Sequence, residues 1–159
     1  MRIVALSCCV AALVACGSND GDDVATDTAA GATDTAPVAS PMSLGDLAGT
    51  WNVTAKPESG ADTSTTRYTL TATSDTTGWT ITFPNRPQAV PVRVVAVQGD
   101  SVVTEAGPFQ SVRRRNMQVT TRNVLRREGD RLVGSTRARY QTTGSDTVLV
   151  LRTEATRAP

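Results

Sequence analysis

The most restrictive feature of this sequence is an alternation with a period of two. From Leu47 onward, apolar or β-branched residues alternate with polar ones in short runs, and Gly, Pro, Asn and Asp break the runs. No run shows a convincing helical period, so the pattern predicts an all-β domain. We count eight strands, which are expected at 50–56, 67–72, 79–83, 90–97, 101–106, 117–127, 131–140 and 148–156.

Alternate residues of a strand point to opposite faces of the sheet, which predicts the inward face of this domain. The expected inward residues are Trp51, Val53, Ala55, Tyr68, Leu70, Trp79, Ile81, Phe83, Leu132, Gly134, Ala138, Tyr140, Leu149, Leu151 and Ala155. One wall is small or polar, through Thr121, Asn123, Gly134, Thr136 and Ala138. The interior is therefore either hollow or filled by its own side chains, and both alternatives stay open.

The connections between the expected strands alternate in length. Long connections cover 57–66, 84–89, 107–116 and 141–147, whereas 98–100 and 128–130 are tight and 73–78 is of medium length. In an up-and-down meander, alternate connections emerge at the same end. The sequence therefore predicts a single small eight-stranded antiparallel up-and-down barrel with one plain end and one decorated mouth.

The stretch SLGDLAGTW, Ser43 to Trp51, resembles the entry to a lipocalin-like domain. The resemblance implies a short helical turn that closes the barrel floor, followed by the signature Gly49-Thr50-Trp51 on the first strand. It also implies that an arginine near the last strand stacks on Trp51, and Arg152 and Arg157 are both candidates. Trp51 is expected to seal the floor as a core residue.

The start of the chain has the pattern of a targeting segment. Arg2 supplies a positive charge, and residues 3–15 form an uncharged, largely apolar run that as a helix would reach only roughly 20 Å. That length is too short to cross a bilayer. We therefore interpret residues 1–15 as a signal peptide.

The residues Leu13-Val14-Ala15-Cys16 resemble the bacterial lipobox at all four positions. The resemblance implies that Cys16 receives acyl chains such as palmitate, becomes the mature N-terminus and anchors the protein in the lipid bilayer. Gly17 follows instead of Asp, which in that family implies the outer membrane of a two-membrane bacterium, on its periplasmic or outer face.

Residues 16–42 are predicted to be a lipidated, acidic and disordered linker. They consist largely of Ala, Thr, Asp, Gly, Ser and Pro, a composition that cannot bury enough apolar surface to fold. As a random coil this linker would span roughly 30 Å. The barrel domain is then expected at 43–159.

The composition excludes several classes of chemistry. The chain has no histidine, and Cys16 is the only cysteine left once the signal peptide is removed. Histidine triads, thiol nucleophiles, disulfides and His/Cys zinc sites are excluded, and we expect no enzyme, metal or cofactor. Only Glu105 and Glu154 fall in predicted strands, where ion pairs with arginines are the preferred interpretation over a catalytic pair.

The charge is distributed unevenly. Residues 17–46 carry six aspartates and no basic residue, whereas the chain from Leu47 onward has 15 basic and nine acidic residues and a charge of +6. Export argues against nucleic acid as the main partner, and a basic body near an envelope favours anionic lipid headgroups or other acidic polymers.

Basic residues also gather in the expected mouth connections, which makes the mouth a candidate ligand site. The candidates are Arg86, Arg113, Arg114 and Arg115, with Phe109 as an apolar neighbour. We predict that a small apolar or amphipathic ligand enters the barrel with its anionic end at these arginines. The alternative that 113–115 form a solvated loop with no partner stays open. The alternative function is a protein-interaction module, such as a periplasmic protease inhibitor, or a structural envelope protein.

Overall fold

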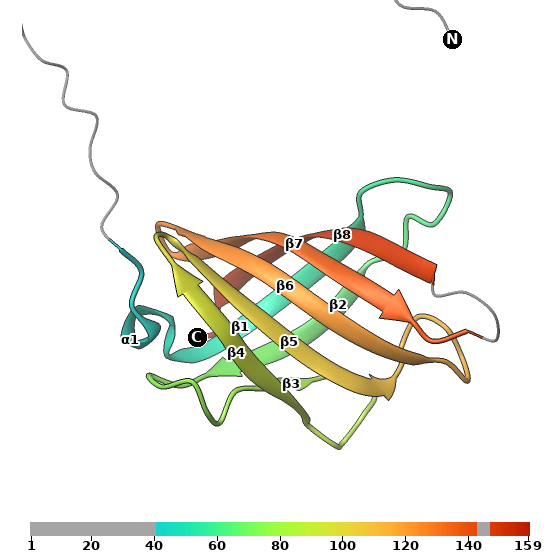
Figure 1. Ribbon diagram of the computed structural model, residues 1–159, viewed down its shortest axis with the longest axis horizontal. Coiled ribbons are helices and arrows are strands. Elements are labelled where there is room, and N and C mark those ends of the chain that lie inside the picture. The colour runs from blue at the N-terminus through green and yellow to red at the C-terminus, as the bar shows by residue number, and fades with distance from the viewer. Residues whose placement is uncertain (1–40, 143–146) are drawn as a thin grey trace, which may run out of the picture. The chain divides into compact units, whose positions relative to one another are not determined.

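The computed structural model describes residues 41–142 and 147–159, which form a closed antiparallel barrel of eight strands in chain order (Figure 1). The elements are α1 (Leu44–Leu47), β1 (Gly49–Pro57), β2 (Thr66–Ala72), β3 (Thr80–Thr82), β4 (Val90–Gln98), β5 (Ser101–Gln110), β6 (Gln118–Glu128), β7 (Arg131–Tyr140) and β8 (Thr147–Arg157). The predicted all-β, up-and-down, eight-stranded barrel is confirmed. The signal peptide, the lipobox with Cys16 and the linker up to residue 40 lie outside the described residues.

The predicted strands differ from the observed ones mainly at β5. This strand runs to Gln110, although the sequence pattern predicts its end at Ala106. The pairing of β5 with β6 shifts register between Ala106 and Phe109, and beyond this irregularity the ladder continues. The first four residues of the predicted mouth connection 107–116 therefore belong to the strand, and that boundary is wrong.

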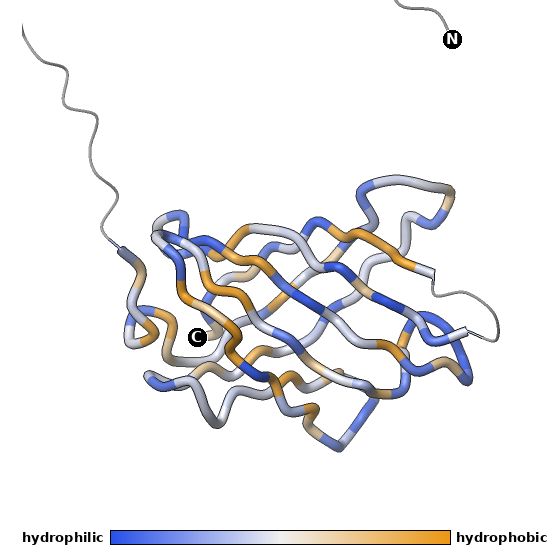
Figure 2. Tube along the Cα trace, viewed as in Figure 1, coloured by the Kyte–Doolittle hydropathy of each residue, from blue (hydrophilic) through white to orange (hydrophobic). Residues whose placement is uncertain are grey.

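The two ends of the barrel differ as the connection lengths predict. The short β4–β5 and β6–β7 turns lie at one end together with α1 and the C-terminus, and we call this end the floor (Figure 1). The longer β1–β2, β3–β4 and β5–β6 connections lie at the opposite end, the mouth (Figure 1). Figure 2 shows apolar and polar residues following one another along the strands, as a barrel with one buried face requires.

The interior contains two apolar clusters. The floor cluster is built around Trp51, Trp79 and Leu47, and it also includes Met42, Val53, Leu70, Ala72, Ile81, Phe83, Val90, Val92, Val102, Ala106, Leu125, Leu132 and Ala155. The mouth cluster consists of Ala55, Val119, Ala138, Tyr140 and Leu151. Tyr68 and Phe109 pack against both clusters, so they link the two halves of the core.

A buried polar layer separates the two clusters on β5, β6, β7 and β8. The side-chain amide of Asn123 donates to the hydroxyl of Thr104 at 3.1 Å and accepts from the hydroxyl of Thr136 at 2.7 Å. The hydroxyls of Thr136 and Thr153 lie 2.6 Å apart. Because these buried polar groups bond to one another, the layer fixes the mutual position of the strands at little cost in desolvation.

The floor is closed by what we call the floor clasp, which consists of Trp51, Arg157 and the carbonyls of Asp46, Leu47 and Ala48. The indole N–H of buried Trp51 donates to the Leu47 carbonyl at 2.8 Å. The guanidinium of Arg157 lies 4.5 Å from the centre of the Trp51 ring and donates to the carbonyls of Asp46 at 2.6 Å and Ala48 at 2.9 Å. A cation over an indole face is favourable electrostatically, so the contact adds to the hydrogen bonds.

Of the two arginines left open by the sequence, Arg157 takes the position over Trp51. Arg152 is exposed and lies 3.2 Å from Glu154, so its assignment to the tryptophan is wrong. The physical reason is strand parity. Leu151, Thr153 and Ala155 are buried, so alternate residues of β8 face inward and Arg152, which lies between Leu151 and Thr153, faces outward.

Gly49 explains why the signature begins with glycine. Its φ of 131° lies in a region that L side chains rarely adopt. A Cβ at this position would also lie 2.8 Å from Nη1 of Arg157. Any other residue would therefore strain the backbone and push the arginine off the tryptophan.

The turn before Gly49 is the helical turn expected from the resemblance. α1 begins with a capping box, in which Ser43 accepts from the backbone N–H of Asp46 while the Asp46 carboxylate accepts from the N–H of Ser43. Met42, predicted as the last linker residue, is buried in the floor cluster and donates its N–H to the Gly99 carbonyl at 2.7 Å. The barrel domain therefore includes Met42, because its side chain fills the floor. Across 41–142 and 147–159, no helix combines the length and the apolar character needed to cross a bilayer.

Candidate functional site

A cavity of about 50 Å³ lies inside the barrel toward the mouth. Its lining includes the aromatic rings of Phe83, Phe109 and Tyr140, together with polar groups of Tyr68, Asn123 and Thr136. Arg113 and Ser111 also line it, from the connection between β5 and β6. An apolar cavity with a few convergent polar groups is the usual form of a small-molecule site.

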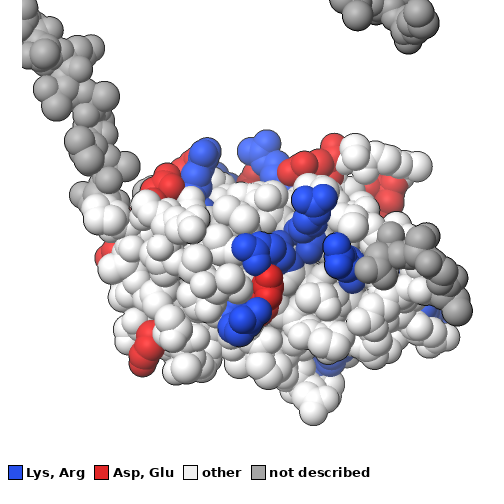
Figure 3. Space-filling view, viewed as in Figure 1, with Lys and Arg blue, Asp and Glu red and all other residues white. Residues whose placement is uncertain are grey.

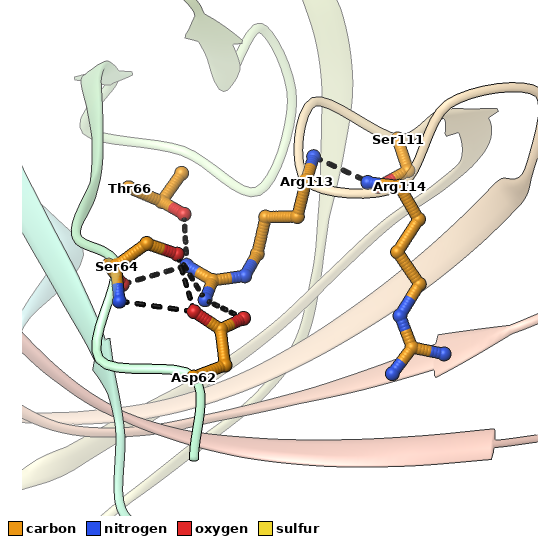
Figure 4. Close-up of polar contacts among 6 residues, drawn as sticks. All are labelled: Asp62, Ser64, Thr66, Ser111, Arg113 and Arg114. Carbon is orange, nitrogen blue, oxygen red and sulfur yellow. Dashed lines mark hydrogen bonds and ion pairs between the residues drawn. The ribbon is translucent and has the colours of Figure 1, made fainter.

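The mouth is closed by a second set of contacts, which we call the mouth clasp: Arg113, Asp62, Ser64 and Thr66 (Figure 4). Nη2 of Arg113 lies 2.7 Å from the Asp62 carboxylate and 2.9 Å from the Ser64 hydroxyl. Nη1 donates to the Thr66 hydroxyl at 2.7 Å and to the Ser64 carbonyl at 3.0 Å. The Arg113 side chain is only 9% exposed, so the clasp ties the β5–β6 connection to the β1–β2 connection.

The backbone at Arg113 is held by a hydroxyl. The side chain of Ser111 accepts from the backbone N–H groups of Arg113 at 3.1 Å and of Arg114 at 3.0 Å (Figure 4). This turn, formed by a serine side chain, directs Arg113 toward the β1–β2 connection.

One hydrogen-bond donor of the mouth clasp has no partner among the described residues. This donor is the buried Nε–H of Arg113. Buried donors in native proteins are almost always paired, so an unpaired one requires an explanation. Arg113 also lines the cavity, so this unpaired N–H belongs to a side chain of the cavity wall.

The carboxylate of the mouth clasp, on Asp62, has a lowered pKa. Hydrogen bonds from the Ser64 hydroxyl and the Ser64 backbone, and then from Arg113, lower the pKa of Asp62 from 3.8 to about 2. The carboxylate therefore remains charged and balances the guanidinium at neutral pH.

The inner end of the cavity is neutral. Burial raises the pKa of Tyr68 from 10.0 to about 12, and a hydrogen bond with Thr136 opposes that rise. The phenol keeps its proton, and among the described residues that line the cavity Arg113 is the one charged side chain. The site thus offers a neutral polar inner end, aromatic walls and a cation at its entrance.

Two other predicted mouth residues, Arg86 and Phe109, both lie next to Phe83, whose ring lines the cavity. The guanidinium of Arg86 lies 5.8 Å from the centre of the Phe83 ring, and Arg86 shares a surface hollow at the rim with Arg113. Phe109 lies in β5, where its ring centre is 5.8 Å from that of Phe83. Both residues therefore belong to the site or its rim.

The arginines after Arg113 behave differently from it. Arg114 stacks over Tyr140 at 4.3 Å from the ring centre, which covers the mouth cluster from outside. Arg115 is exposed and lines neither the cavity nor the rim hollow. The interpretation of 113–115 as one solvated run is wrong for Arg113, because this side chain is buried in the mouth clasp.

Sequence reasoning did not identify Asp62, Ser64 and Thr66 as the partners of Arg113. The Ser64 N–H and hydroxyl both donate to the Asp62 carboxylate, and an Asp two residues before a Ser is a recognisable local turn signal. The pairing of that turn with Arg113, which is 51 residues away from Asp62, has no local signal.

The two strand carboxylates lie on the outer face of the barrel, where each is engaged by arginines. Glu105 accepts from Arg93 and Arg122, and these hydrogen bonds lower the pKa of Glu105. Glu154 accepts from Arg131 at 2.7 Å. Neither carboxylate lines the cavity, and no cluster of three or more potential metal ligands occurs among the residues described.

No family model, curated protein or solved structure matches this chain. The closed eight-stranded barrel fits a lipocalin-like fold. Because a fold does not by itself identify a function, the functional argument rests on the chemistry of the cavity and the surface.

Proposed function

We propose that this chain is an envelope lipoprotein, anchored in the outer membrane through acyl chains on Cys16, whose lipocalin-like barrel binds a small amphipathic ligand. The ligand has a short apolar end and an anionic or strongly accepting end. The observation that carries the proposal is the buried, unpaired Nε–H of Arg113 beside an otherwise neutral cavity. The role is binding rather than catalysis.

The cavity sets the size of the group that enters it. Its volume of about 50 Å³ is far below the roughly 300–1,000 Å³ of sites that enclose a drug-sized ligand. Only a few apolar heavy atoms fit between Phe83, Phe109 and Tyr140, and the rest of the ligand lies at the mouth. An acceptor placed at Nε of Arg113 completes this guanidinium while Asp62 keeps its own bond to Nη2.

Short carboxylates test this arrangement. We expect straight-chain carboxylates from butanoate to octanoate to shift the NMR signals of the Arg113 Nε–H and of the Phe109 ring in the full chain. Arg113→Gln should weaken binding roughly tenfold or more, since it removes a charge-assisted hydrogen bond. Arg115→Gln, which removes the same charge two residues later, is the matched control and should bind as the unmodified chain does.

Two results would contradict the ligand proposal. One is the absence of any saturable shift across the carboxylate series. The other is an equal loss of binding in the Arg113 and Arg115 variants, which would indicate attraction by net charge alone.

The lipid anchor has a separate test. Cys16→Ser should prevent acylation and the cleavage that follows it, because the thiol accepts the lipid. Labelling cells with palmitate should mark the unmodified chain and leave the variant unlabelled and uncut. Label that persists in the variant would refute the lipoprotein assignment.

A second candidate is a protein-interaction module or structural envelope protein that holds no interior ligand. The small cavity volume favours it, since an eight-stranded barrel can be filled by its own side chains. Native mass spectrometry of the protein from an envelope extract separates the two candidates. A retained small molecule supports the first, and a retained protein without one supports the second.

A further inference from the structure

The outer face of β4 to β7 carries a row of charged residues that pair directly across the strands. Arg93 lies opposite Glu105, Glu105 opposite Arg122, and Arg122 opposite Arg137. Figure 3 shows this face, with basic side chains gathered around a single acidic one. The row is therefore a continuous surface feature that sheet pairing builds from residues far apart in the sequence.

The ion pairs within the row leave it with excess positive charge. Glu105 bonds to Arg93 and Arg122, and in the described ranges no acidic side chain pairs with Arg137. Like charges directly opposite each other on a sheet are destabilising, so the Arg122–Arg137 pair costs stability. A shallow groove beside the pair is lined by Glu105, Thr120, Arg122, Arg137, Arg139 and Val148.

Exposed valines surround these arginines on the same outer face. Val148 lies opposite Arg139, and Val150 lies opposite Arg137. Their exposed fractions are 39% and 37%, and Val124 on β6 is 42% exposed. Arginines mixed with exposed apolar side chains suit a headgroup layer, where charge attracts anionic lipid and apolar surface is removed from water.

We infer that Arg122, Arg137, Val124, Val148 and Val150, which we call the outer patch, dock the barrel onto anionic lipid headgroups. Phosphate oxygens would lie between Arg122 and Arg137, whose planar guanidinium groups suit bidentate contacts with phosphate. The mouth arginines are poorer candidates, because Arg113 is committed to the mouth clasp and Arg114 to Tyr140. The outer patch lies outside the barrel, so the inference goes beyond ligand binding in the cavity.

Vesicle binding tests the outer patch. The full chain carrying Cys16→Ser has no acyl anchor, and we compare it with the same chain carrying Arg122→Gln and Arg137→Gln. A matched control carries Lys56→Gln and Arg67→Gln, which remove the same charge from exposed positions on β1 and β2. Strand β2 lies opposite β6 in the closed barrel, and Lys56 on β1 pairs with Arg152, which is not part of the outer patch.

We expect the outer-patch variant to bind vesicles of phosphatidylglycerol and phosphatidylcholine about 30-fold more weakly at low salt. This corresponds to about 1 kcal/mol for each of two basic residues, converted at 1.36 kcal/mol per tenfold change. The control should lose less than about threefold, and high salt should remove the difference. Vesicles of pure phosphatidylcholine should bind the three chains equally. Because all three chains contain the apolar run 3–15, any binding that this run contributes cancels in the comparison.

Equal losses in the two double variants, or no loss in either, would overturn the inference. Thermal unfolding provides a second readout, because Arg137→Gln removes a like-charge contact and should leave the unfolding midpoint unchanged or raised. A lowered midpoint would show that Arg137 serves the fold. Arg137→Lys keeps the charge without the bidentate guanidinium, so it should bind more tightly than Arg137→Gln and more weakly than the unmodified residue.

Discussion

An arginine closes each end of the barrel, but the two arginines have different kinds of partner. At the floor, Arg157 donates to the main-chain carbonyls of Asp46 in α1 and of Ala48 after it, and it covers the Trp51 ring. At the mouth, Arg113 bonds mainly to the side chains of Asp62, Ser64 and Thr66, and the Asp62 side chain is 53% exposed. Main-chain carbonyls keep their place while the backbone is folded, whereas side chains can rotate into water.

The comparison therefore distinguishes the floor clasp, which stabilises the fold, from the mouth clasp, which can open. The floor clasp buries a large ring at the end of the main apolar cluster, so its loss should affect the whole fold. The mouth clasp closes a connection over a small cavity, so its loss should mainly change access to that cavity. Four changes test this difference, in order of decreasing expected effect.

The largest effect is expected from Trp51→Ala. Because Trp51 is fully buried, its removal leaves a cavity that the barrel cannot collapse, and the free energy of unfolding should fall by about 3–5 kcal/mol. Chemical denaturation measures the change. A loss below about 1 kcal/mol would contradict the structural role given to the floor clasp.

Arg157→Gln comes next, with an expected loss of about 2 kcal/mol. The variant removes two hydrogen bonds from a charged donor and a cation–π contact, and part of this is screened because Arg157 is exposed. Arg152→Gln is the matched control on the same strand, and as a surface ion-pair residue it should cost less than about 0.5 kcal/mol. Similar losses in both variants would remove the distinction between the two arginines.

Arg113→Gln should cost about 1 kcal/mol, less than the floor variant, because Asp62 and Ser64 regain water when their partner leaves. Hydrogen exchange should accelerate in the β1–β2 and β5–β6 connections while the floor strands stay protected. Arg115→Gln should change neither stability nor exchange. If exchange accelerates throughout the barrel, the mouth clasp holds the fold as the floor clasp does.

The smallest effect is expected from acid. The pKa of Asp62 is about 2 in the folded chain and near 3.8 when unpaired, so its contribution is present above pH 4 and is lost as the pH falls from about 4 to about 2. Exchange of the Arg113 guanidinium protons, followed by NMR, should rise in that interval. Asp62→Asn should remove the pH dependence.

The acid experiment needs an internal reference at the floor. The pKa of Asp46 is also lowered, chiefly by the Ser43 hydroxyl, so the cap of α1 weakens in acid as well. The bond from the Trp51 indole to the Leu47 carbonyl contains no titrating group and should persist. Parallel loss of the Trp51 and Arg113 signals would mean global unfolding instead of a local release at the mouth.

The same contrast decides how much the sequence could predict. The strands and the floor follow from local signals: a period of two, turn residues, and the Gly49-Thr50-Trp51 signature. The sequence was even sufficient to choose Arg157 over Arg152. Leu151 and Ala155 are predicted to face inward, and Arg157 is an even number of residues from both, so it lies on the same side of β8. These features depend on residues within one element or one register.

The mouth clasp and the outer patch depend on which elements meet in three dimensions. A run of three arginines looks uniform in the sequence, yet Arg113 is buried and Arg115 is exposed. The difference arises because the β1–β2 connection supplies Asp62, which is 51 residues away. Likewise, Arg122 and Arg137 meet only through the pairing of β6 with β7.

The division of the core into two clusters gives the protein a built-in pair of optical probes. Its only two tryptophans, Trp51 and Trp79, belong to the floor cluster, while its two tyrosines, Tyr68 and Tyr140, line the cavity near the mouth. Indole emission thus reports on the floor, and phenol absorbance and near-ultraviolet circular dichroism report on the mouth. A ligand entering the cavity should perturb the tyrosine bands and leave the tryptophan spectrum unchanged, without any label attached to the chain.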